Sequence, residues 1–390
     1  MRILLLSFYF RPDLSAGSFR AAALVSALLK ADPNLEIEVI TTLPNRYSSF
    51  SPDAPEVEEH DRLQINRIAL PGHKGGMLDQ ALAFLRFAAR ARSLTRGKRY
   101  DLVYATSSRL MTAALGAHLA RRMRAPLYLD IRDIFSDTIG DVLPRIAPVS
   151  KPVFEWLERR TIAAAASVNL VSEGFREHFE ARNPATRLTF FTNGIDDEFL
   201  NLDLPELKAT DPLVILYAGN VGEGQGLHRI VPAIARRLGS RVVVRIIGGG
   251  GRLELLARAV AEAGVDNVEL APPVGRQELI SEYARADVLL LHLNDYPAFR
   301  KVLPSKLFEY AATGRPVLAG IAGHSAEFAE ANVENCAVFP PCDDAAAEAA
   351  LARLTLVSTE RAGFKKKFAR RVIMGHLAAD ILAQAKVSAR

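Results

Sequence analysis

Short, almost wholly apolar runs alternate with amphipathic helical patterns along the whole chain, and this alternation restricts the fold more than any other feature. The runs are too apolar for a sheet with one solvated face, so they predict parallel strands that are covered on both sides. Strands that alternate with helices in this way are typical of a doubly wound α/β sheet. In the first half, strands are predicted at Ile3–Phe8, Glu36–Thr41, Leu102–Ala105, Leu127–Asp130, Val168–Val171 and Leu188–Thr192, and helices at Ser18–Leu29 and Arg109–Arg122.

A break in both periods follows at Phe199–Pro212, where Pro205, Asp211 and Pro212 interrupt the pattern. A second α/β set begins after it. Its strands are predicted at Leu213–Ala218, Val242–Gly248, Val268–Leu270, Val288–Leu293, Pro316–Ala319 and Ala337–Phe339, and its helices at Gly226–Leu238, Arg252–Ala263, Arg276–Ala284, Lys306–Thr313 and Asp344–Leu354.

A chain of 390 residues is too long for one compact core. We therefore predict two Rossmann-like domains, over residues 1–198 and 199–371, facing each other across a cleft. Ligands bind outside the carboxyl ends of the strands in such sheets, so the chemistry is expected in the cleft.

The composition is that of an ordinary globular protein with a mild positive charge. A net charge of +5 allows an anionic partner without requiring one. The two cysteines, Cys336 and Cys342, form no disulfide framework and have no zinc-type spacing, which favours a reducing compartment. The apolar start, Met1–Phe10, is cut off by Arg11, Pro12 and Asp13, so it predicts a buried strand rather than a signal peptide. We expect a cytoplasmic protein, with a peripheral membrane contact left open.

The segment Leu303–Val317 carries the strongest local signal. Pro304 and Ser305 predict a helix start, with Ser305 as the N-cap. Lys306 then falls in the first turn, where its charge opposes the helix dipole, and this conflict favours a bound anion such as a diphosphate. Glu309 shares a face with Lys306, where its carboxylate is either a ribose ligand or a solvated surface group.

Two glycine-rich turns follow strands in the same half, at Gly219–Gly226 and Gly248–Gly251. Their glycines either admit a ligand close to the backbone or only make tight turns. A dinucleotide-binding fingerprint needs a carboxylate at the end of the next strand, and that strand ends in glycines instead. A dehydrogenase is therefore disfavoured.

Polar residues also follow two strands of the first half. The loop Tyr9–Ser18 is a second candidate for anion binding. At the end of another strand, Asp130 and Asp133 flank Arg132. The two carboxylates either orient an acceptor hydroxyl or are neutralised by Arg132 in a structural network.

At these segments the chain resembles glycosyltransferase family 4, which has the two-domain GT-B architecture, and it is most similar to the bacterial branch that builds lipid-linked polysaccharide, O-antigen and capsule. The resemblance runs the whole length. The matching segments are Phe10–Arg20, Asp130–Asp133, Thr192–Asp196, the turn at Gly219 and Leu303–Pro316.

The resemblance implies a retaining transfer from a nucleotide-sugar, with no metal and no further cofactor. Lys306 and the Ser305 backbone would stabilise the leaving diphosphate, Glu309 would hold the ribose, and Gly17 would approach the diphosphate from the N-terminal side. The catalytic set would be Asp133, Lys306 and Glu309, with Asp13, Asp130 and Arg132 on the acceptor side. The leaving phosphate itself would take the acceptor proton, and the last helix, within residues 372–390, would pack back on the N-terminal domain. The other positions assigned to the donor are Gly219, Asn220, Gly222, Gln225, Gly248, Val274 (in the base-contacting loop Pro273–Gly275) and Leu307.

Several positions depart from the family pattern. Lys301 stands where the first of two glutamates spaced eight positions apart is usual. Asn220 and Gln225 stand where many members have Arg and Lys, so Lys306, with Arg300 or Lys301 nearby, would have to supply the charge. The usual histidine on the catalytic side also has no clear counterpart, and this puts the role of Asp133 in question.

The stretch Leu78–Arg99 combines apolar residues at helical spacing (Leu78, Leu82, Leu85 and Ala89) with six basic residues. It is either a membrane-facing helix on the acceptor domain or a core-packed helix with a solvated basic face. Nucleic acid is disfavoured, because no nucleic-acid-binding fold accompanies the charge.

The prediction is therefore a UDP-sugar-dependent transferase that acts on a glycan or polyprenyl-linked acceptor at the inner face of a bacterial membrane. Two alternatives remain. One is a GT-B sugar-nucleotide epimerase or hydrolase, and the other is a non-catalytic nucleotide- or membrane-binding scaffold. Acceptor contacts are expected in loops such as Pro44–Glu59.

Overall fold

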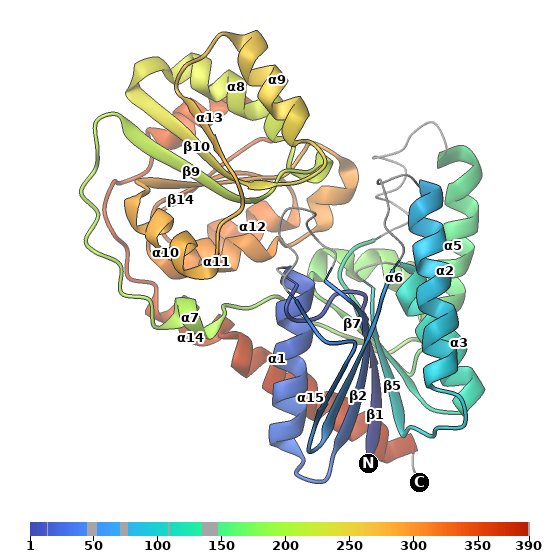
Figure 1. Ribbon diagram of the computed structural model, residues 1–390. Helices are drawn as coiled ribbons and strands as arrows, with labels where there is room; N and C mark the ends of the chain where they lie inside the picture. Colours follow the sequence, from blue (N-terminus) through green and yellow to red (C-terminus); the bar gives the residue numbers. More distant parts are fainter. Residues whose placement is uncertain (14, 45–52, 71–76, 108–109, 135–146, 389–390) are drawn as a thin grey trace. The chain divides into compact units, whose positions relative to one another are not determined.

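The structure of the chain is a computed structural model, and it describes residues 1–13, 15–44, 53–70, 77–107, 110–134 and 147–388. The chain divides into two compact units (Figure 1). Unit 1 is Met1–Thr192 with Arg370–Arg390, and unit 2 is Asn193–Ala369. Each has helices around a mainly parallel sheet, so the predicted α/β class is confirmed.

The sheet of unit 1 has eight strands in the order β3-β4-β2-β1-β5-β6-β7-β8. All neighbours pair in parallel except β3 and β4, which are antiparallel. The central strands are buried along their whole length, which explains their unbroken apolar runs. The strands are β1 (Arg2–Leu6), β2 (Glu36–Thr42), β3 (Val57–His60), β4 (Leu63–Ile68), β5 (Leu102–Thr106), β6 (Leu127–Ile131), β7 (Ser167–Leu170) and β8 (Leu188–Thr189).

Helices cover both faces of this sheet. Figure 1 shows α1 and α15 on one face and α2, α3 and α5 on the other. The final helix packs against α1 within unit 1, the position expected of it from the sequence. The helices are α1 (Ala16–Ala31), α2 (Met77–Leu94), α3 (Leu110–Met123), α5 (Ala147–Ala163), α6 (Arg176–Arg182) and α15 (Arg370–Ser388), with a 3₁₀ turn at Glu173–Phe175.

The sheet of unit 2 has six parallel strands in the order β11-β10-β9-β12-β13-β14. Its strand order reverses direction between β9 and β12, the position where open α/β sheets bind ligands. The strands are β9 (Leu213–Asn220), β10 (Val242–Gly249), β11 (Val268–Ala271), β12 (Val288–His292), β13 (Val317–Gly320) and β14 (Cys336–Phe339).

In Figure 1, α8, α9 and α13 lie on one face of this sheet and α10, α11 and α12 on the other. A buried apolar cluster fills the space between the sheet and the first group. The helices are α7 (Asp197–Leu200), α8 (Leu227–Leu238), α9 (Leu253–Ala263), α10 (Arg276–Arg285), α11 (Ser305–Thr313), α12 (His324–Asn332), α13 (Asp344–Leu351) and α14 (Ala362–Phe368), with 3₁₀ turns at Glu223–Gln225, Gly239–Arg241 and Pro297–Lys301.

The chain passes between the units at Thr192 and at Ala369, rather than at the predicted residues 198 and 371. Contacts of the segment that begins with Asn193 explain the earlier boundary. The Asn193 side chain donates to the Leu303 carbonyl (3.1 Å), and the Ile195 N–H donates to the Phe368 carbonyl (2.8 Å). The segment from Asn193 therefore belongs to unit 2, although the break in the hydrophobic period begins only at Phe199.

The edge strand β3 of the unit 1 sheet corrects one prediction. The segment Pro44–Glu59 was expected to be a loop, yet its end forms β3, which pairs with β4. The residues of β3 are polar and mostly exposed, so they carry no hydrophobic period to reveal a strand. Residues 45–52 of that segment, and Arg109 at the start of a predicted helix, lie outside the described residues.

Candidate functional site

The start of α11 is built differently from the prediction. The N-cap is Pro304, not Ser305, and Ser305 is the first residue of the helix. Pro304 has φ −70° and ψ 133°, an extended conformation that its ring favours. Among the described residues, no side chain makes a capping hydrogen bond at this helix end. The first N–H groups of a helix have no intrahelical acceptor, so the backbone at Ser305 and Lys306 offers donors to an anion.

Lys306 and Glu309 form an ion pair on the first turns of α11. The Lys306 Nζ lies 3.0 Å from Glu309 Oε1, and the two side chains are 25% and 16% exposed. The Glu309 carboxylate offsets part of the unfavourable interaction between the Lys306 charge and the helix dipole. Lys306 is therefore partnered, but it remains open enough to meet a ligand.

Tyr283, on α10, completes this cluster and was missed in the sequence. Its hydroxyl donates to Glu309 Oε1 and lies 3.4 Å from Lys306 Nζ. Burial, followed by the nearby Glu309 charge, raises the pKa of Tyr283 well above its usual range, so the phenol stays a neutral donor. Both bonds to Glu309 fall on Oε1. Among the residues that the structure describes, Glu309 Oε2 has no hydrogen-bond partner and is available to a ligand.

The turn after β9 lies beside this cluster. Gly219 approaches both the Lys306 side chain and the Tyr217 hydroxyl, and that hydroxyl donates to the Asn220 carbonyl (2.7 Å). The fold therefore brings together the Gly219 turn and the start of α11, two segments far apart in sequence that were both assigned to the donor.

Asn220 and Gln225 bond to each other. The Asn220 amide donates to Gln225 Oε1 (2.9 Å), and the Gly222 N–H donates to the same oxygen (3.1 Å). Their side chains thus fix the shape of the turn. The two cations usual at these positions in the family are replaced by a neutral pair.

The second glycine turn and the expected base-contacting loop are neighbours. Gly248 faces Gly219 so closely that a Cβ on Gly248 would overlap the Gly219 carbonyl, which gives this glycine a packing role. Gly249, next to it, packs against Pro273 in the loop that holds half-buried Val274. Leu307, which was also assigned to the donor, is wholly buried, and its N–H donates to the Pro304 carbonyl (3.2 Å).

A second polar cluster, around Glu223, stabilises the turn that begins at Gly219. The sequence analysis did not predict it. Glu223 accepts from the Tyr296 hydroxyl and from Arg252 Nε, each at 2.6 Å. Burial acts to raise the pKa of Glu223, but these two partners outweigh it and the pKa is lowered. Glu223 is therefore a charged anchor of the turn.

His292, at the end of β12, fixes the same turn through the backbone. Its Nδ1 lies 2.6 Å from the Gln225 carbonyl, and its Nε2 accepts the Cys342 N–H (3.0 Å). Burial lowers the pKa of His292 to about 4, so the ring is neutral, with its proton on Nδ1. This histidine holds loops together and does not face a substrate.

In unit 1, Asp130 does not fit its predicted acceptor role. It is 1% exposed and accepts two hydrogen bonds from Arg20 (2.8 and 3.0 Å) and one from Asn169 (2.7 Å). Burial alone would raise its pKa, but the Arg20 charge lowers it and keeps the carboxylate ionised. The remaining Arg20 donors bind the Phe191 and Thr192 carbonyls. Asp130 is thus part of a structural network, although Arg20, and not Arg132, neutralises it.

The other acceptor-side residues lie around the start of α1 and the end of β6. Arg132 lies directly against Gly17, where a Cβ would overlap its guanidinium group. Asp13 is buried in the preceding turn, and its carbonyl accepts the Ser15 N–H (3.1 Å). Asp133 is exposed at the rim of a pocket in the same unit. Gly17 and Arg132 are therefore brought together.

Two family models match the chain, each within one part of it. The glycosyl transferase 4-like domain matches residues 18–194, and the glycosyl transferases group 1 family matches residues 202–371. Together the two models cover most of the chain.

Two curated relatives are similar over different lengths. A putative colanic acid biosynthesis glycosyl transferase, WcaI, of Escherichia coli K12 is 33% identical over 113 residues, which are 29% of this chain and 26% of that protein. That match thus spans only about a quarter of the relative. A D-inositol 3-phosphate glycosyltransferase of Mycolicibacterium smegmatis is 24% identical over 327 residues, covering 79% of this chain and 72% of that protein.

Solved structures of similar fold cover nearly the whole chain. A sucrose-phosphate synthase of Thermosynechococcus elongatus has a TM-score of 0.74 at 17% identity, with 98% of this chain and 99% of that chain covered. The Anabaena protein HepE, in complex with UDP and glucose, has a TM-score of 0.66 at 16% identity over 98% of this chain and 99% of that one. These likenesses show that the fold is GT-B. The two family models show that the chain is a glycosyltransferase.

Within the described ranges, no helix combines the length and the apolar character that crossing a membrane requires.

Proposed function

We propose that the chain transfers a sugar from a UDP-sugar to a hydroxyl group of a glycan or polyprenyl-linked acceptor in the assembly of a bacterial surface polysaccharide. The observation that carries this proposal is the Lys306–Glu309 pair at the uncapped start of α11, beside the Gly219 turn. Cationic and backbone donors lie there within one helical turn of a carboxylate that has a free oxygen.

This arrangement suits the two halves of a nucleoside diphosphate. The first N–H groups of α11 and the Lys306 ammonium stabilise negative charge on the diphosphate as the sugar leaves. Glu309 Oε2 accepts hydrogen bonds from the ribose hydroxyls, while Tyr283 holds Oε1. No metal is needed in this scheme, because the helix end and Lys306 provide the positive charge.

In the proposed reaction the bond from the anomeric carbon to the diphosphate oxygen breaks, and a bond from the same carbon to the acceptor oxygen forms on the same face. The acceptor proton passes to the leaving phosphate oxygen. The neutral Asn220–Gln225 pair adds no charge, so Lys306 provides most of the charge stabilisation.

The choice of uridine and of surface polysaccharide rests on the relatives. HepE binds UDP and glucose in a GT-B fold, and the partial match to WcaI points to colanic acid biosynthesis. Both are properties of those proteins, and for this chain they direct which donors and acceptors to try first.

Exposed apolar residues on unit 1 support the proposal of a lipid-linked acceptor. The predicted apolar stripe of α2 does not face the core: Leu82 and Leu85 are 60% and 62% exposed, while Phe84 and Phe87 are buried against the sheet. Leu78 has no described side chain.

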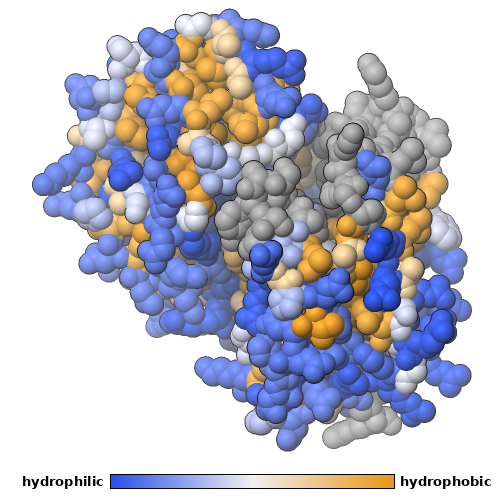
Figure 2. Space-filling view, viewed as in Figure 1, coloured by the Kyte–Doolittle hydropathy of each residue, from blue (hydrophilic) through white to orange (hydrophobic). Residues whose placement is uncertain are grey.

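Helix α5, which like α2 packs against α3, also has exposed apolar residues, Val153 and Trp156. Exposed arginines surround these apolar residues, and the Arg160 guanidinium lies 5.1 Å from the centre of the Trp156 ring. Figure 2 shows hydrophobic residues (orange) among hydrophilic ones (blue) on this side of unit 1. An apolar surface ringed by positive charge complements an anionic lipid headgroup layer. We propose that this surface holds a cytoplasmic enzyme on the inner membrane.

The proposal is tested by turnover. Purified protein is incubated with UDP-glucose, UDP-galactose, UDP-N-acetylglucosamine and the matching GDP-sugars, with undecaprenyl diphosphate-linked N-acetylglucosamine as acceptor. We expect UDP release that depends on the acceptor, together with a heavier glycolipid by mass spectrometry. UDP-sugar consumption that is independent of acceptor would favour a hydrolase or epimerase, and UDP binding without any turnover would favour a scaffold.

A further inference from the structure

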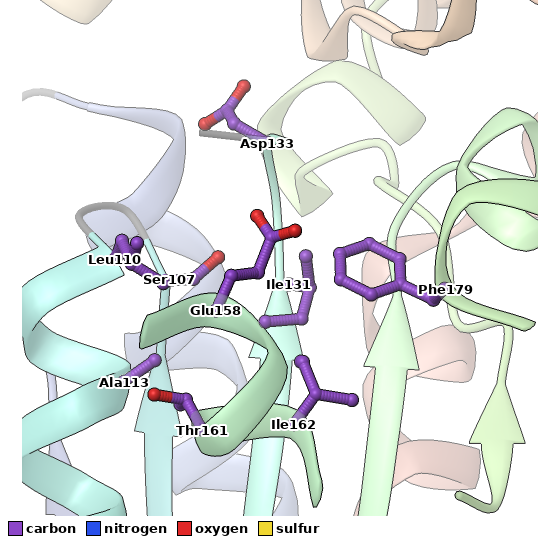
Figure 3. A pocket seen from close by; sticks show the side chains of 9 residues that line it. All are labelled: Ser107, Leu110, Ala113, Ile131, Asp133, Glu158, Thr161, Ile162 and Phe179. Atoms are coloured by element: carbon purple, nitrogen blue, oxygen red, sulfur yellow. The ribbon is translucent and has the colours of Figure 1, made fainter. Parts of the chain in front are cut away.

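Arg132 follows β6 at its carboxyl end and lies beside the first turn of α1. Figure 3 shows Ile131 and Asp133 lining a small cavity on the α3 and α5 face of the sheet. Side chains alternate between the two faces of a strand, so Arg132, which lies between them in the sequence, faces the opposite side. There its guanidinium group lies against Gly17. The carboxyl ends of parallel strands are where this class of sheet binds ligands, so the guanidinium group occupies a functional position in unit 1.

The charge of Arg132 is not paired within the described part of the chain. Its backbone N–H donates to Ser107 Oγ (3.0 Å), but its side chain makes no hydrogen bond or ion pair there. The carboxylate of Asp130, two positions earlier on the same face, is held by Arg20 and Asn169. Burial lowers the pKa of Arg132, the nearby carboxylates act against this, and the nearby arginines add to it. A half-buried cation without a bonded partner is unfavourable, which points to an anionic ligand.

The start of α1 adds open hydrogen-bond donors beside this cation. The side chain of Ser15 caps the helix and accepts the Ser18 N–H (3.2 Å). Among the described residues, the N–H groups of Ala16 and Gly17 have no acceptor, because they lie in the first turn. A side chain at position 17 would overlap the Arg132 guanidinium group, so glycine allows the cation and the helix end to meet. A cation at the positive end of a helix is unfavourable unless an anion lies between them.

The Ser18 hydroxyl is a further donor at this turn. Ser18 is wholly buried, and its Oγ has no hydrogen-bond partner within the described ranges. The Cα–Cβ bonds of a helix tilt toward its N-terminus, so this hydroxyl points back to the first turn. A buried hydroxyl without a partner costs stability that a ligand oxygen would recover. A guanidinium group, two N–H groups and a hydroxyl suit a phosphate, which has three or more acceptor oxygens.

The donor does not need this second group of anion ligands. In unit 2, the start of α11 already offers Lys306 and open N–H groups to the diphosphate of the donor. A nucleotide-sugar carries a single diphosphate, so a second site of the same chemistry in unit 1 suits another phosphorylated molecule.

We infer that Arg132 and the start of α1 bind the phosphate groups of a phosphorylated acceptor, such as the diphosphate of a polyprenyl-linked sugar. The inference rests on the proposed function, since it names the chemistry of the acceptor in the same reaction. Gly17, which the resemblance assigned to the donor, is then part of the acceptor site.

The test is calorimetric titration of geranyl diphosphate into the whole protein saturated with UDP, which occupies the donor site. The buffer holds about 0.15 M salt, so that contacts with exposed arginines are screened. We expect geranyl diphosphate to bind, and geranyl glucoside, which has the same chain without phosphate, to bind more weakly. Arg132→Gln removes the charge and should weaken geranyl diphosphate binding about tenfold, with UDP affinity unchanged.

Arg121→Gln is the matched control, because Arg121 is an exposed arginine of the same unit, in the last turn of α3. It should leave geranyl diphosphate binding unchanged. Ser18→Ala removes the unpaired hydroxyl and should weaken binding about threefold, and it provides a second variant if Arg132→Gln does not fold. Neither Arg132→Gln nor Ser18→Ala should lower the melting temperature of the ligand-free protein, because neither side chain loses a bonded partner. A residue with only a structural role would lower it.

No binding of geranyl diphosphate, equal binding of geranyl glucoside, or binding that the Arg132 and Ser18 variants leave unchanged would each overturn the inference. Weaker UDP binding by Arg132→Gln, with geranyl diphosphate unaffected, would assign Arg132 to the donor diphosphate and would also overturn it. A wild-type protein that does not bind UDP would instead refute the proposed function, so the two failures are distinguishable.

Discussion

The Lys306 ammonium lies 3.0 Å from the Glu309 carboxylate at the start of α11, and both bonds made to that carboxylate fall on one oxygen. The pair places a cation, the open N–H groups of a helix and a free carboxylate oxygen within one turn. In the proposed reaction these groups divide the donor between them, with the diphosphate on Lys306 and the ribose on Glu309.

Replacing Lys306 with alanine should slow the chemical step. It removes the one cation that the account places on the leaving diphosphate, and losing one such preorganised group typically lowers kcat about 10²–10³-fold. The measurement is steady-state turnover of the active UDP-sugar. Lys366→Ala, which changes the same charge at an exposed site of unit 2, is the control. A kcat that stays within a factor of three of wild type would mean that Lys306 does not stabilise the leaving group.

His292 should make unit 2 less stable in mild acid. Burial lowers the pKa of His292 to about 4, below its ordinary value of 6.5. Between pH 6.5 and 4 the unfolded chain therefore binds a proton at His292 that the folded chain does not. The contribution of the neutral, buried His292 to the free energy of unfolding is present in full above pH 6.5 and is lost as the pH falls. The loss by pH 5 is about 2 kcal/mol.

Urea unfolding at pH 7 and pH 5 measures this loss. The variant His292→Gln lowers stability at both pH values, but it should show a smaller difference between them. Equal pH dependence in wild type and variant would show that another group is responsible.

The buried Arg20–Asp130 pair should behave as a unit. Arg20→Leu leaves a buried carboxylate without its cation and should destabilise the protein by about 3–5 kcal/mol. Adding Asp130→Leu removes the orphaned charge and should recover part of that loss. Chemical denaturation of the two single variants and the double variant checks this, and strictly additive losses would contradict it.

The exposed leucines of α2 should contribute to membrane binding. Burial of one leucine in the lipid interface stabilises the complex by about 1.5–3 kcal/mol, so Leu82→Glu with Leu85→Glu should weaken binding to phosphatidylglycerol vesicles by at least tenfold. Cosedimentation measures this, with Val357→Glu as a control at an exposed apolar residue of unit 2. Binding that is unchanged in the α2 variant would favour a helix whose basic face is only solvated.

The parallel strands were predictable because they are buried on both faces and so read as unbroken apolar runs. The edge strand β3 was not, because its Val57–His60 side chains face solvent and carry no period. The start of α11 was predicted from Pro304 and Ser305, although the N-cap is Pro304 rather than Ser305 because proline supplies the extended backbone itself.

Site residues that lie within one segment were predictable from the sequence. Site residues that meet only when distant segments pack together were not. Lys306 and Glu309 are three residues apart, so their shared face follows from the helical period. Tyr283 reaches its partner Glu309 only through the packing of separate helices, and nothing in its local sequence distinguishes it from a core residue. The structural role of Asp130 was hidden for the same reason, because its partner Arg20 lies 110 residues away in the sequence, on α1.

The most direct test of the account is calorimetric titration of UDP, GDP, ADP and NAD into wild type, Glu309→Ala and the control Glu330→Ala, whose exposed carboxylate lies on α12. We expect a preference for UDP, weakened by more than about 1 kcal/mol in Glu309→Ala and unchanged in the control. Selective binding of NAD, no nucleotide binding, or equal UDP affinity in wild type and Glu309→Ala would contradict it.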